Sequence, residues 1–571
     1  MPQRIFRATK ESRRTAEHPQ MVDAVTTQVV RNRVSSLMQE MHYHFYRSGY
    51  STIIRESRDF SCVILDCRGG VLVAPPMFFH APVYHHLVSK ILERTGDDIH
   101  PGDMFVCNHP YEGGLPHVSD MAFVAPVLCG TTLVGFAGSI AHKADIGGTM
   151  PGSTSANATE IFQEGLLLPP VKIYSRGVFN SDLERLILAN SRQPELVRGD
   201  MHAQMAATRV GAERIVQTCD QFGIAAVMEA FAALLNGAAE ELRAAIAALP
   251  DGEASAAGFM DNDGVELDRP VRFAVTVRVE RGEITFDFTA SDRQAKGPVN
   301  LRPSMVEACV FYCLIGALDP KLAFNDGMRE AVRFVYAPDT VTNASAPAPV
   351  SSYQAANLKL TDVILQALAA FRPQRGVANG GSSGALLISW QDGGRPGQPS
   401  LQYEIHGSAY GGGNGNDGCS AVATHISNLH VTPIEILETE FPCRIVEFDL
   451  VPDSCGAGEF RGGLAFRRIY ELLQDATVVR RYDRAKFPPD GVAGGKPGSR
   501  SRFVIRLGEK TEQETPASGR YEMRAGERFL LQSAGGGGYG DPHRRNRAAL
   551  NRDIAEGLVS AEAAKREYGQ T

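Results

Sequence analysis

Two apolar runs separated by a short turn constrain the fold of this chain more than any other feature. The runs are MAFVAPVL (residues 121–128) and TTLVGFAGSI (residues 131–140), separated by Cys129 and Gly130. This pattern is typical of an antiparallel β-hairpin. With a turn centred near residue 130 or 131, the numbers of facing residues sum to about 261. Asp120, at the foot of the first strand, is therefore expected to face the neighbourhood of His142.

His117 is a third polar residue beside this open end of the hairpin. Its spacing from Asp120 would place the two on opposite faces of a regular strand, so they converge only if residues 116–120 form a turn. The surrounding glycines and prolines favour such a turn. His117, Asp120 and His142 would then form a set typical of a catalytic zinc, manganese or iron site. The alternative is that both histidines are ordinary hydrogen-bonded loop residues.

Other polar residues near this set could extend it. Asp145 and His109 are candidates for additional metal ligands or for groups that orient the ligands. His80, His85 and His86 occur in FFHAPVYHHLVSKIL, which has the pattern of a helix start, and we expect structural roles for them.

A pair of glutamates occurs further along, in TSANATEIFQEGLLLPPVKIY. Glu160 and Glu164 are four residues apart, so a helix would place both on one face. Near a metal ion, these carboxylates and that of Asp145 are candidates for general acid or base catalysis. The alternative is a solvent-exposed helix face.

Glycine is the outlier of the composition, with 57 residues among 571. The segment HGSAYGGGNGNDGCSAVATH (residues 406–425) combines glycines with short polar side chains, and its N–H groups could bind an anion. We therefore expect Gly412, Gly413 and Asn414 to shape a substrate cavity near the hairpin. A surface turn that tolerates many sequences is the alternative.

Motifs for nucleotide binding and for serine hydrolysis are absent from the sequence. No Gly-Lys-Ser/Thr follows residues 406–425, and GGGGYG (residues 535–540) lacks the lysine and the strand–helix context of a phosphate-binding loop. GGSSGA (residues 380–385) lacks the strand–turn–helix surroundings of a nucleophilic serine. We therefore expect neither an ATP site in this chain nor serine-hydrolase activity.

The succession of strand-like and helical segments predicts a mixed α/β (α+β), multidomain fold with a helical segment between β-rich parts. We expect a helix over residues 21–49, strand, turn and strand over 57–76, and helices throughout 181–247. The predicted domains are a flexible N-terminus (1–20), an α/β domain with the metal-site hairpin (21–180), a helical segment (181–250), a second α/β domain (251–400), a β-rich glycine-loop domain (401–545) and a helical tail (546–571).

Composition excludes several classes of protein. A formal net charge of -7 gives no basic surplus for a nucleic-acid partner. No window has the roughly 18 apolar residues that cross a membrane. The ten cysteines are scattered without metal-binding spacing, which favours reduced thiols. We therefore expect a cytoplasmic protein.

Eight ordered motifs resemble one known family. They extend from about residue 21 to 568, and together they resemble the hydantoinase B / oxoprolinase family. That family includes the B-type component of N-methylhydantoinase, the C-terminal half of 5-oxoprolinase, caprolactamase, and the alpha-type subunits of acetone and acetophenone carboxylases. The motifs are NHPYEGGLPHVSDMAFVAPV, AHKADIGGTMPGS, TEIFQEGLLLPPVKIY, DFTASDRQAKGPVN, PIEILETEFP, DSCGAGEFRGG, DRAKFPPDGVAGG and SAGGGGYGDP.

The resemblance implies a division of labour between two subunits. A hydantoinase A-type partner would bind ATP and phosphorylate the amide or enolate oxygen of a small-molecule substrate, in an α2β2-like hetero-oligomer. It also implies a divalent metal, Mn or Zn, at His117, Asp120 and His142. His109 stands where many relatives have an acidic residue, so we expect it to influence substrate binding.

The expected function is therefore that of the catalytic B-type subunit of an ATP-dependent hydrolase of cyclic amides, such as hydantoins, oxoproline or lactams. Water would attack the phosphorylated carbon, with Asp145 or Glu164 as a candidate base. One alternative is the alpha-type subunit of an ATP-dependent ketone carboxylase. The other is a structural subunit whose partner carries out all the chemistry.

Overall fold

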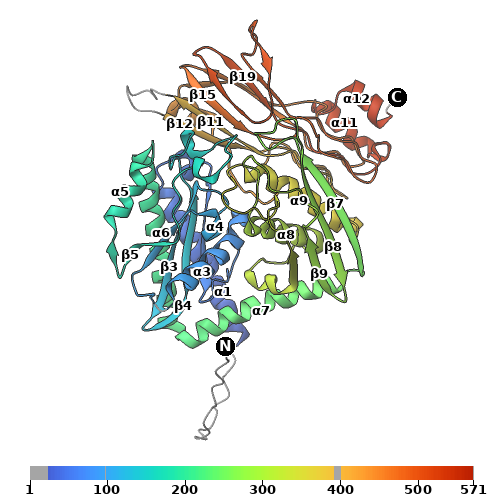
Figure 1. The fold of residues 1–571 in the computed structure, drawn as a ribbon. Helices are drawn as coiled ribbons and strands as arrows, with labels where there is room; N and C mark the ends of the chain where they lie inside the picture. Colours follow the sequence, from blue (N-terminus) through green and yellow to red (C-terminus); the bar gives the residue numbers. More distant parts are fainter. Residues whose placement is uncertain (1–22, 97, 391–399, 570–571) are drawn as a thin grey trace, which may run out of the picture.

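The computed structural model of the chain describes residues 23–96, 98–390 and 400–569. It contains four β-sheets, and the long helices α6 (Pro194–Phe222) and α7 (Ile224–Ala247) lie between its β-rich parts (Figure 1). The predicted mixed α/β fold is confirmed. The N-terminus that we expected to be flexible lies outside the described residues, and the predicted domain boundaries stay predictions.

Antiparallel strands form the first sheet, in the order β1-β4-β3-β2-β5-β6. The predicted hairpin is formed by β3 and β4, which lie between β1 and β2 in this sheet. Asp120 lies directly opposite His142, and a bulge between Val127 and Leu128 takes up the irregularity at the turn end. The strands are β1 (Phe60–Asp66), β2 (Met104–Cys107), β3 (Asp120–Cys129), β4 (Thr132–His142), β5 (Val171–Ser175) and β6 (Val178–Phe179).

The second strand expected over residues 57–76 is not formed, and that prediction was wrong. β1 is followed by a turn in which the Gly70 N–H donates to the Asp66 side chain at 2.6 Å. Beyond the turn, only Leu65 and Val71 make an isolated bridge. Pro75 and Pro76 have no N–H to donate, so the returning segment cannot extend the ladder.

Helices cover both faces of the first sheet. α1 (Ala24–Ser48) and α6 pack together on one face and α3 on the other, while α7 runs from this sheet toward the second one (Figure 1). The helix predicted over residues 21–49 is confirmed; Asp23 caps it by accepting from the Thr26 N–H. The remaining helices of this part are α2 (Thr52–Arg55), α3 (Ala81–Thr95), α4 (Pro110–Gly113) and α5 (Ser181–Ala189).

A second sheet, β10-β9-β8-β7, is separated from the first by helices α8 and α9. One continuous apolar core runs from the inner face of the first sheet through α3, α8 and α9 to the second sheet. Cys309 and Cys313 are buried on α8, where they pack as small apolar residues. The elements are β7 (Gly252–Met260), β8 (Val271–Glu280), β9 (Glu283–Asp287), β10 (Val332–Val335), α8 (Pro303–Leu318) and α9 (Tyr353–Ala369).

The C-terminal part is built on two further sheets, β12-β11-β15-β18 and β13-β14-β19-β16-β17. Trp390 and Tyr470, one from each sheet, belong to the shared core. The elements are β11 (Gly384–Trp390), β12 (Ser400–His406), β13 (Cys443–Leu450), β14 (Phe466–Leu472), β15 (Ala476–Arg481), β16 (Arg502–Ile505), β17 (Gln513–Glu514), β18 (Gly519–Met523), β19 (Arg528–Gln532), α10 (Ile434–Glu440), α11 (Arg547–Ala555) and α12 (Ala561–Tyr568).

Within the described ranges, no single helix is both long and apolar enough to cross a membrane. Taken together, α6 and α7 pass that test by length and composition alone, but the pair is bent by 111°.

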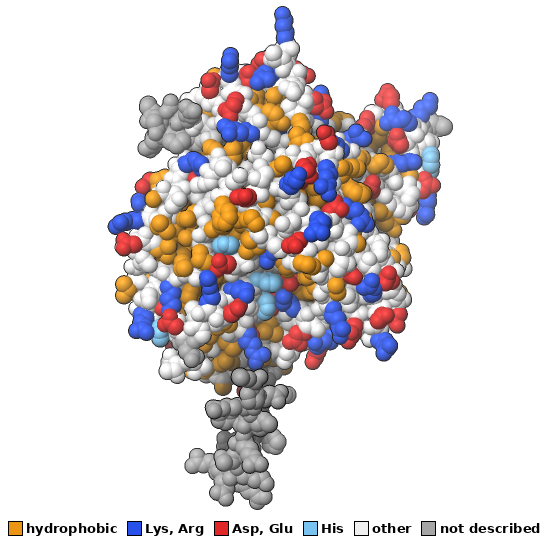
Figure 2. Space-filling view, viewed as in Figure 1, with side chains coloured by type: hydrophobic (Ala, Val, Ile, Leu, Met, Phe, Trp, Pro, Cys, Tyr) orange, Lys and Arg blue, Asp and Glu red, His pale blue; other side chains and the backbone are white. Residues whose placement is uncertain are grey.

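On the face shown in Figure 2, basic and acidic side chains are interspersed.

Glycine-rich segments of the C-terminal part pack against one another through their backbones. The Gly412 N–H donates to the Gly537 carbonyl at 2.8 Å, and a Cβ at Gly412 would lie 2.4 Å from the Phe460 carbonyl oxygen. A Cβ at Gly536 would lie 2.0 Å from the Tyr410 carbonyl oxygen. Only a residue without a side chain allows backbones to approach so closely. We call residues 410–418, 456–463, 491–498 and 535–538 the glycine layer.

We expect Gly412→Ala to lower the thermal stability of the chain, because the added Cβ has no space beside Phe460. Overpacking of this kind costs about 1–3 kcal/mol, which corresponds to a few degrees in melting temperature. Scanning calorimetry measures the shift. Gly316→Ala is the matched control, because Gly316 is exposed on α8 with open space around the added carbon. Equal melting temperatures for the two variants would contradict the packing argument.

Candidate metal centre

His117, Asp120 and His142 converge at the open end of the β3–β4 hairpin. The Asp120 N–H donates to the His117 carbonyl at 3.3 Å, which closes the turn predicted for residues 116–120. Asp120 Oδ1 lies 3.1 Å from His117 Nε2 and 3.5 Å from His142 Nδ1. One potential ligand atom from each residue lies within 4.8 Å of the others. The three side chains are at most 3 % exposed, so this group forms a closed centre inside the protein.

The unsatisfied atoms of this group fit a metal ion. Both ring nitrogens of His117, Nε2 of His142 and Oδ2 of Asp120 are buried and make no hydrogen bond with the described residues. Burying such atoms without a partner is costly, and a coordinated cation would remove that cost. Two imidazoles and one carboxylate suit zinc, manganese or iron. The group could therefore hold a metal ion.

The protonation of these residues agrees with metal binding. Burial opposes ionisation of Asp120, but its interactions with His117, His142 and His80 outweigh burial and hold the pKa of this carboxyl well below its usual range. Burial lowers the pKa of His142. An ionised carboxylate and a neutral imidazole are the forms that coordinate metals.

Two residues beside the group were not among the predicted ligands. His80, for which the sequence favoured a structural role, places Nε2 3.4 Å from Asp120 Oδ2, while its Nδ1 lies 2.8 Å from Ser61 Oγ. Asp59 Oδ2 lies 3.9 Å from His142 Nδ1, and burial raises the pKa of Asp59 to about 7. Both sit beside β1, whose pairing with β4 no local sequence pattern reveals.

Distant parts of the chain supply the wall around the histidines. The Tyr403 ring, from β12, stacks on His142 with centroids 4.5 Å apart, and the Tyr353 ring, from α9, meets His117 edge-on at 4.9 Å. Arg481, at the end of β15, is buried; it donates to the Ser351 carbonyl, and its Nε has no hydrogen-bond partner among the described residues.

The three predicted acid–base candidates are placed very differently. Asp145 accepts hydrogen bonds from the N–H groups of Gly147, Gly152 and Arg192 and from the Arg192 guanidinium, at 2.8–3.0 Å. Glu160 is exposed. The helix expected to place Glu160 and Glu164 on one face is only the three-residue η3 (Ile161–Gln163), so that expectation was wrong.

Glu164 has the properties of a buried base. Its Oε1 accepts hydrogen bonds from the N–H groups of Val350 and Ser351, at 2.8 and 2.7 Å, while Oε2 is buried without a partner among the described residues. Burial raises the pKa of Glu164 to about 7, although these two N–H donors and Arg481 oppose the rise. Glu164 thus retains a free oxygen that Asp145 lacks.

The predicted substrate-binding residues lie in two places. His109 caps α4, where its Nδ1 accepts from the N–H groups of Tyr111 and Glu112, and burial lowers its pKa. Gly412 and Gly413 belong to the glycine layer, and the amide of exposed Asn414 donates to the Gln374 carbonyl at 3.3 Å. Their role in substrate binding stays a prediction.

Comparison with known proteins identifies the family of this chain. The family model for Hydantoinase B/oxoprolinase matches residues 23–542. The chain belongs to this family. The resemblance found in the eight motifs is thereby confirmed.

Similar proteins match nearly the whole chain. A putative D-/L-hydantoinase component of the B type, from Pseudomonas sp. (strain NS671), is 32 % identical, over 96 % of this chain and 95 % of its own. The crystal structure of ATP-dependent caprolactamase from Pseudomonas jessenii is 27 % identical with a TM-score of 0.89, covering 96 % of both chains. A nucleotide-free acetone carboxylase structure, at 18 % identity, has a TM-score of 0.88 over 96 % of this chain and 79 % of its own, and shows the shared fold.

We expect Asp120→Asn to weaken binding of a divalent cation at least about tenfold, because it removes the charged ligand between the two histidines. After treatment with a chelator, calorimetric titration with Mn²⁺ and with Zn²⁺ measures the affinity. His202→Gln is the control, because the His202 side chain is 51 % exposed and pairs with Glu184 on the surface. Unchanged affinity in Asp120→Asn would show that the group is not the metal site.

Proposed function

We propose that this chain is the catalytic B-type subunit of an ATP-dependent hydrolase of cyclic amides, of the hydantoinase, oxoprolinase or caprolactamase type. The observation that carries the proposal is the buried group His117, Asp120 and His142 with its unsatisfied ligand atoms. The family, whose members similar to this chain along its whole length include components of a hydantoinase and of a caprolactamase, supports it.

Activation of the substrate would depend on a second subunit. The names of these two relatives mark them as the B-type and beta-type components of multi-subunit enzymes, and the sequence of this chain has no phosphate-binding loop. We therefore propose an A-type partner that binds ATP and phosphorylates the amide oxygen, in a hetero-oligomer with this chain. Phosphorylation turns a poor electrophile into one with a good leaving group.

The residues around the metal centre would complete the hydrolysis. A divalent cation, Mn or Zn, held by His117, Asp120 and His142 would supply Lewis acidity and lower the pKa of water. The buried Arg481 guanidinium has no carboxylate among the described residues within ion-pair distance, so it can bind an anionic phosphoryl group. Tyr353 and Tyr403 hold the two histidine rings in place and exclude solvent.

Glu164 is the general base that we propose among the three predicted candidates. Its free oxygen is buried, and its raised pKa lies near neutrality, where a base is most effective. Asp145 is engaged by four donors in organising its own loop, and Glu160 is exposed. Both are therefore less suited to accept a proton from water.

The proposed two-subunit reaction can be tested by reconstitution. We expect turnover of hydantoin, 5-oxoproline or caprolactam only when this chain, its A-type partner and ATP are present together, with phosphate released in step with ring opening. Product formation is followed by chromatography. ATP-dependent carboxylation of acetone with bicarbonate, without hydrolysis of any of the cyclic amides, would support the ketone carboxylase alternative instead.

The role of Glu164 predicts a specific pH dependence. Since a base acts only when ionised, kcat of the complex should rise with pH through about 7, the raised pKa of this carboxyl. Glu164→Gln should lower kcat at least about a hundredfold and abolish the rise. Glu160→Gln, at an exposed position, should leave both unchanged. A pH profile that survives in Glu164→Gln would assign the base elsewhere.

A further inference from the structure

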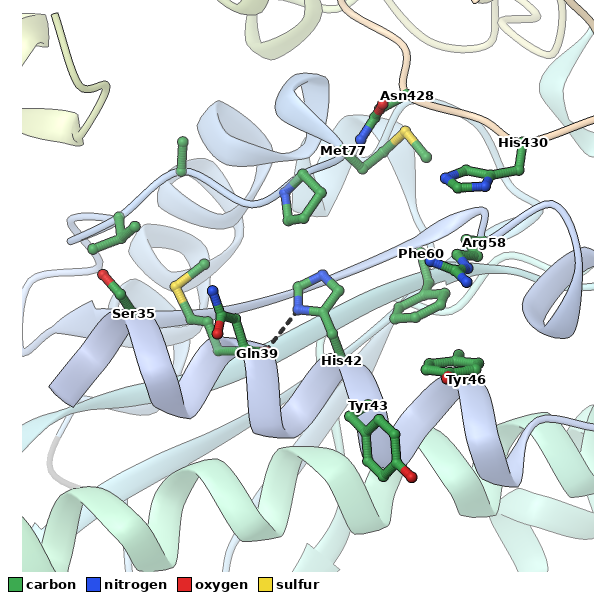
Figure 3. A pocket seen from close by; sticks show the side chains of 14 residues that line it. Ser35, Gln39, His42, Tyr43, Tyr46, Arg58, Phe60, Met77, Asn428 and His430 are labelled. Carbon is green, nitrogen blue, oxygen red and sulfur yellow. Dashed lines mark hydrogen bonds between the residues drawn. The ribbon is translucent and has the colours of Figure 1, made fainter. Parts of the chain in front are cut away.

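A cavity of about 530 Å³ lies beside the first sheet, next to the edge strand β1. α1, the start of β1, the segment 73–77 and the segment 428–430 form its walls (Figure 3). Its volume is in the range of cavities that hold small molecules. The three metal-centre residues His117, Asp120 and His142 do not line it.

The charge of this cavity selects for anions. Of the fourteen described residues that line it, Arg58 alone carries a full charge at neutral pH, and none is acidic. The Arg58 guanidinium carbon lies 4.9 Å from the centroid of the Tyr46 ring. Arg58 has a φ of 54°, a conformation that a residue with a side chain keeps only when its surroundings impose it. Arg58 is exposed, and its guanidinium lies against the Tyr46 ring without an acidic partner among the lining residues.

His42 adds a hydrogen-bond acceptor. Its Nδ1 lies 2.7 Å from the Met38 carbonyl, so the ring must donate its proton there. Burial lowers the pKa of His42, which keeps the ring neutral, and its Nε2 therefore carries a lone pair. That atom is buried without a hydrogen-bond partner among the described residues, and the ring stands in the middle of the lining residues (Figure 3). A ligand would satisfy it with an N–H or O–H group.

The remaining wall is largely apolar. Met38, Phe60 and Met77 line the cavity together with aromatic rings from α1. Such a wall accepts a hydrocarbon or aromatic side chain. The cavity thus offers an anion site, an acceptor and an apolar surface together.

The cavity and the metal centre share a wall. Arg58 and Phe60 line the cavity, whereas Asp59, between them in sequence, lies 3.9 Å from the His142 ring on the other side.

We propose that this cavity binds a small carboxylate that also carries an N–H donor and an apolar side chain, namely an N-carbamoyl or other N-acyl amino acid. Arg58 binds the carboxylate, His42 Nε2 accepts the N–H, and the apolar wall holds the side chain. Addition of water across one ring C–N bond of a hydantoin gives this class of molecule. Its identification as a reaction product rests on the proposed function, whereas its binding does not.

Calorimetric titration of the full-length chain with three probes tests the assignment. N-carbamoyl-L-phenylalanine has all three features, phenethylurea lacks the carboxylate, and 3-phenylpropionate lacks the N–H groups. We expect each truncated probe to bind at least about tenfold more weakly than the complete one. Equal affinity for the three probes, or no binding of the complete one at millimolar concentration, would overturn the proposal.

Two variants connect the probes to the residues. Arg58→Gln should weaken binding of N-carbamoyl-L-phenylalanine about tenfold or more but leave binding of phenethylurea unchanged. His42→Phe should weaken binding of the two probes that have N–H groups by a similar factor. Arg47→Gln is the control, because Arg47 is exposed on the same helix and outside the cavity. If Arg58→Gln weakened binding of all three probes equally, or of none, the assignment would be overturned. Because no turnover is measured, this result is independent of whether the proposed hydrolysis is observed.

Discussion

The register of the β3–β4 hairpin is the constraint on which the site depends. A slip of one residue would move His142 to the opposite face of the sheet and separate it from Asp120. Burial on both faces prevents the slip, since Ala122 and Val124 belong to one core while Met121 and Phe123 belong to another. The bulge near the turn leaves the open end in register. The candidate metal centre is therefore positioned by the packing of residues outside it.

The other residues of the site come from helices and strands outside the first sheet. The first sheet supplies Asp120 and His142, and the turn before β3 supplies His117. α9 supplies Tyr353, and the sheet β12-β11-β15-β18 supplies Tyr403 and Arg481. Binding sites often form where such units meet, because a rigid framework on each side holds the side chains. Here the enclosure also leaves buried polar atoms unpaired among the described residues, which a bound cation and an anionic substrate would compensate.

Local patterns explain what the sequence could predict. Two apolar runs and a short turn placed Asp120 opposite His142, and the helix over residues 24–48 followed from its buried face. Tyr403 and Arg481 could not be found this way, because only tertiary packing brings them to residues more than 250 positions away in sequence. The prediction that a helix places Glu160 and Glu164 on one face was wrong for a local reason. η3 ends after Gln163, and Gly165 has a φ of 148°, so no regular helix forms there.

Glycine richness was open to two interpretations, and the close packing of backbones distinguishes them. A loop that approaches a ligand and a layer of packed backbones both require residues without side chains. At Gly412 and Gly536 the atoms that a Cβ would strike are carbonyl oxygens of neighbouring segments. Backbone carbonyls cannot move aside as side chains can, so these two positions need glycine for packing, whatever else the loop does. Asp417, within the layer, pairs with Arg545 at 2.7 Å, and Arg545 pairs in turn with Asp553 of α11 at 2.6 Å. These two ion pairs link the layer to the C-terminal helices.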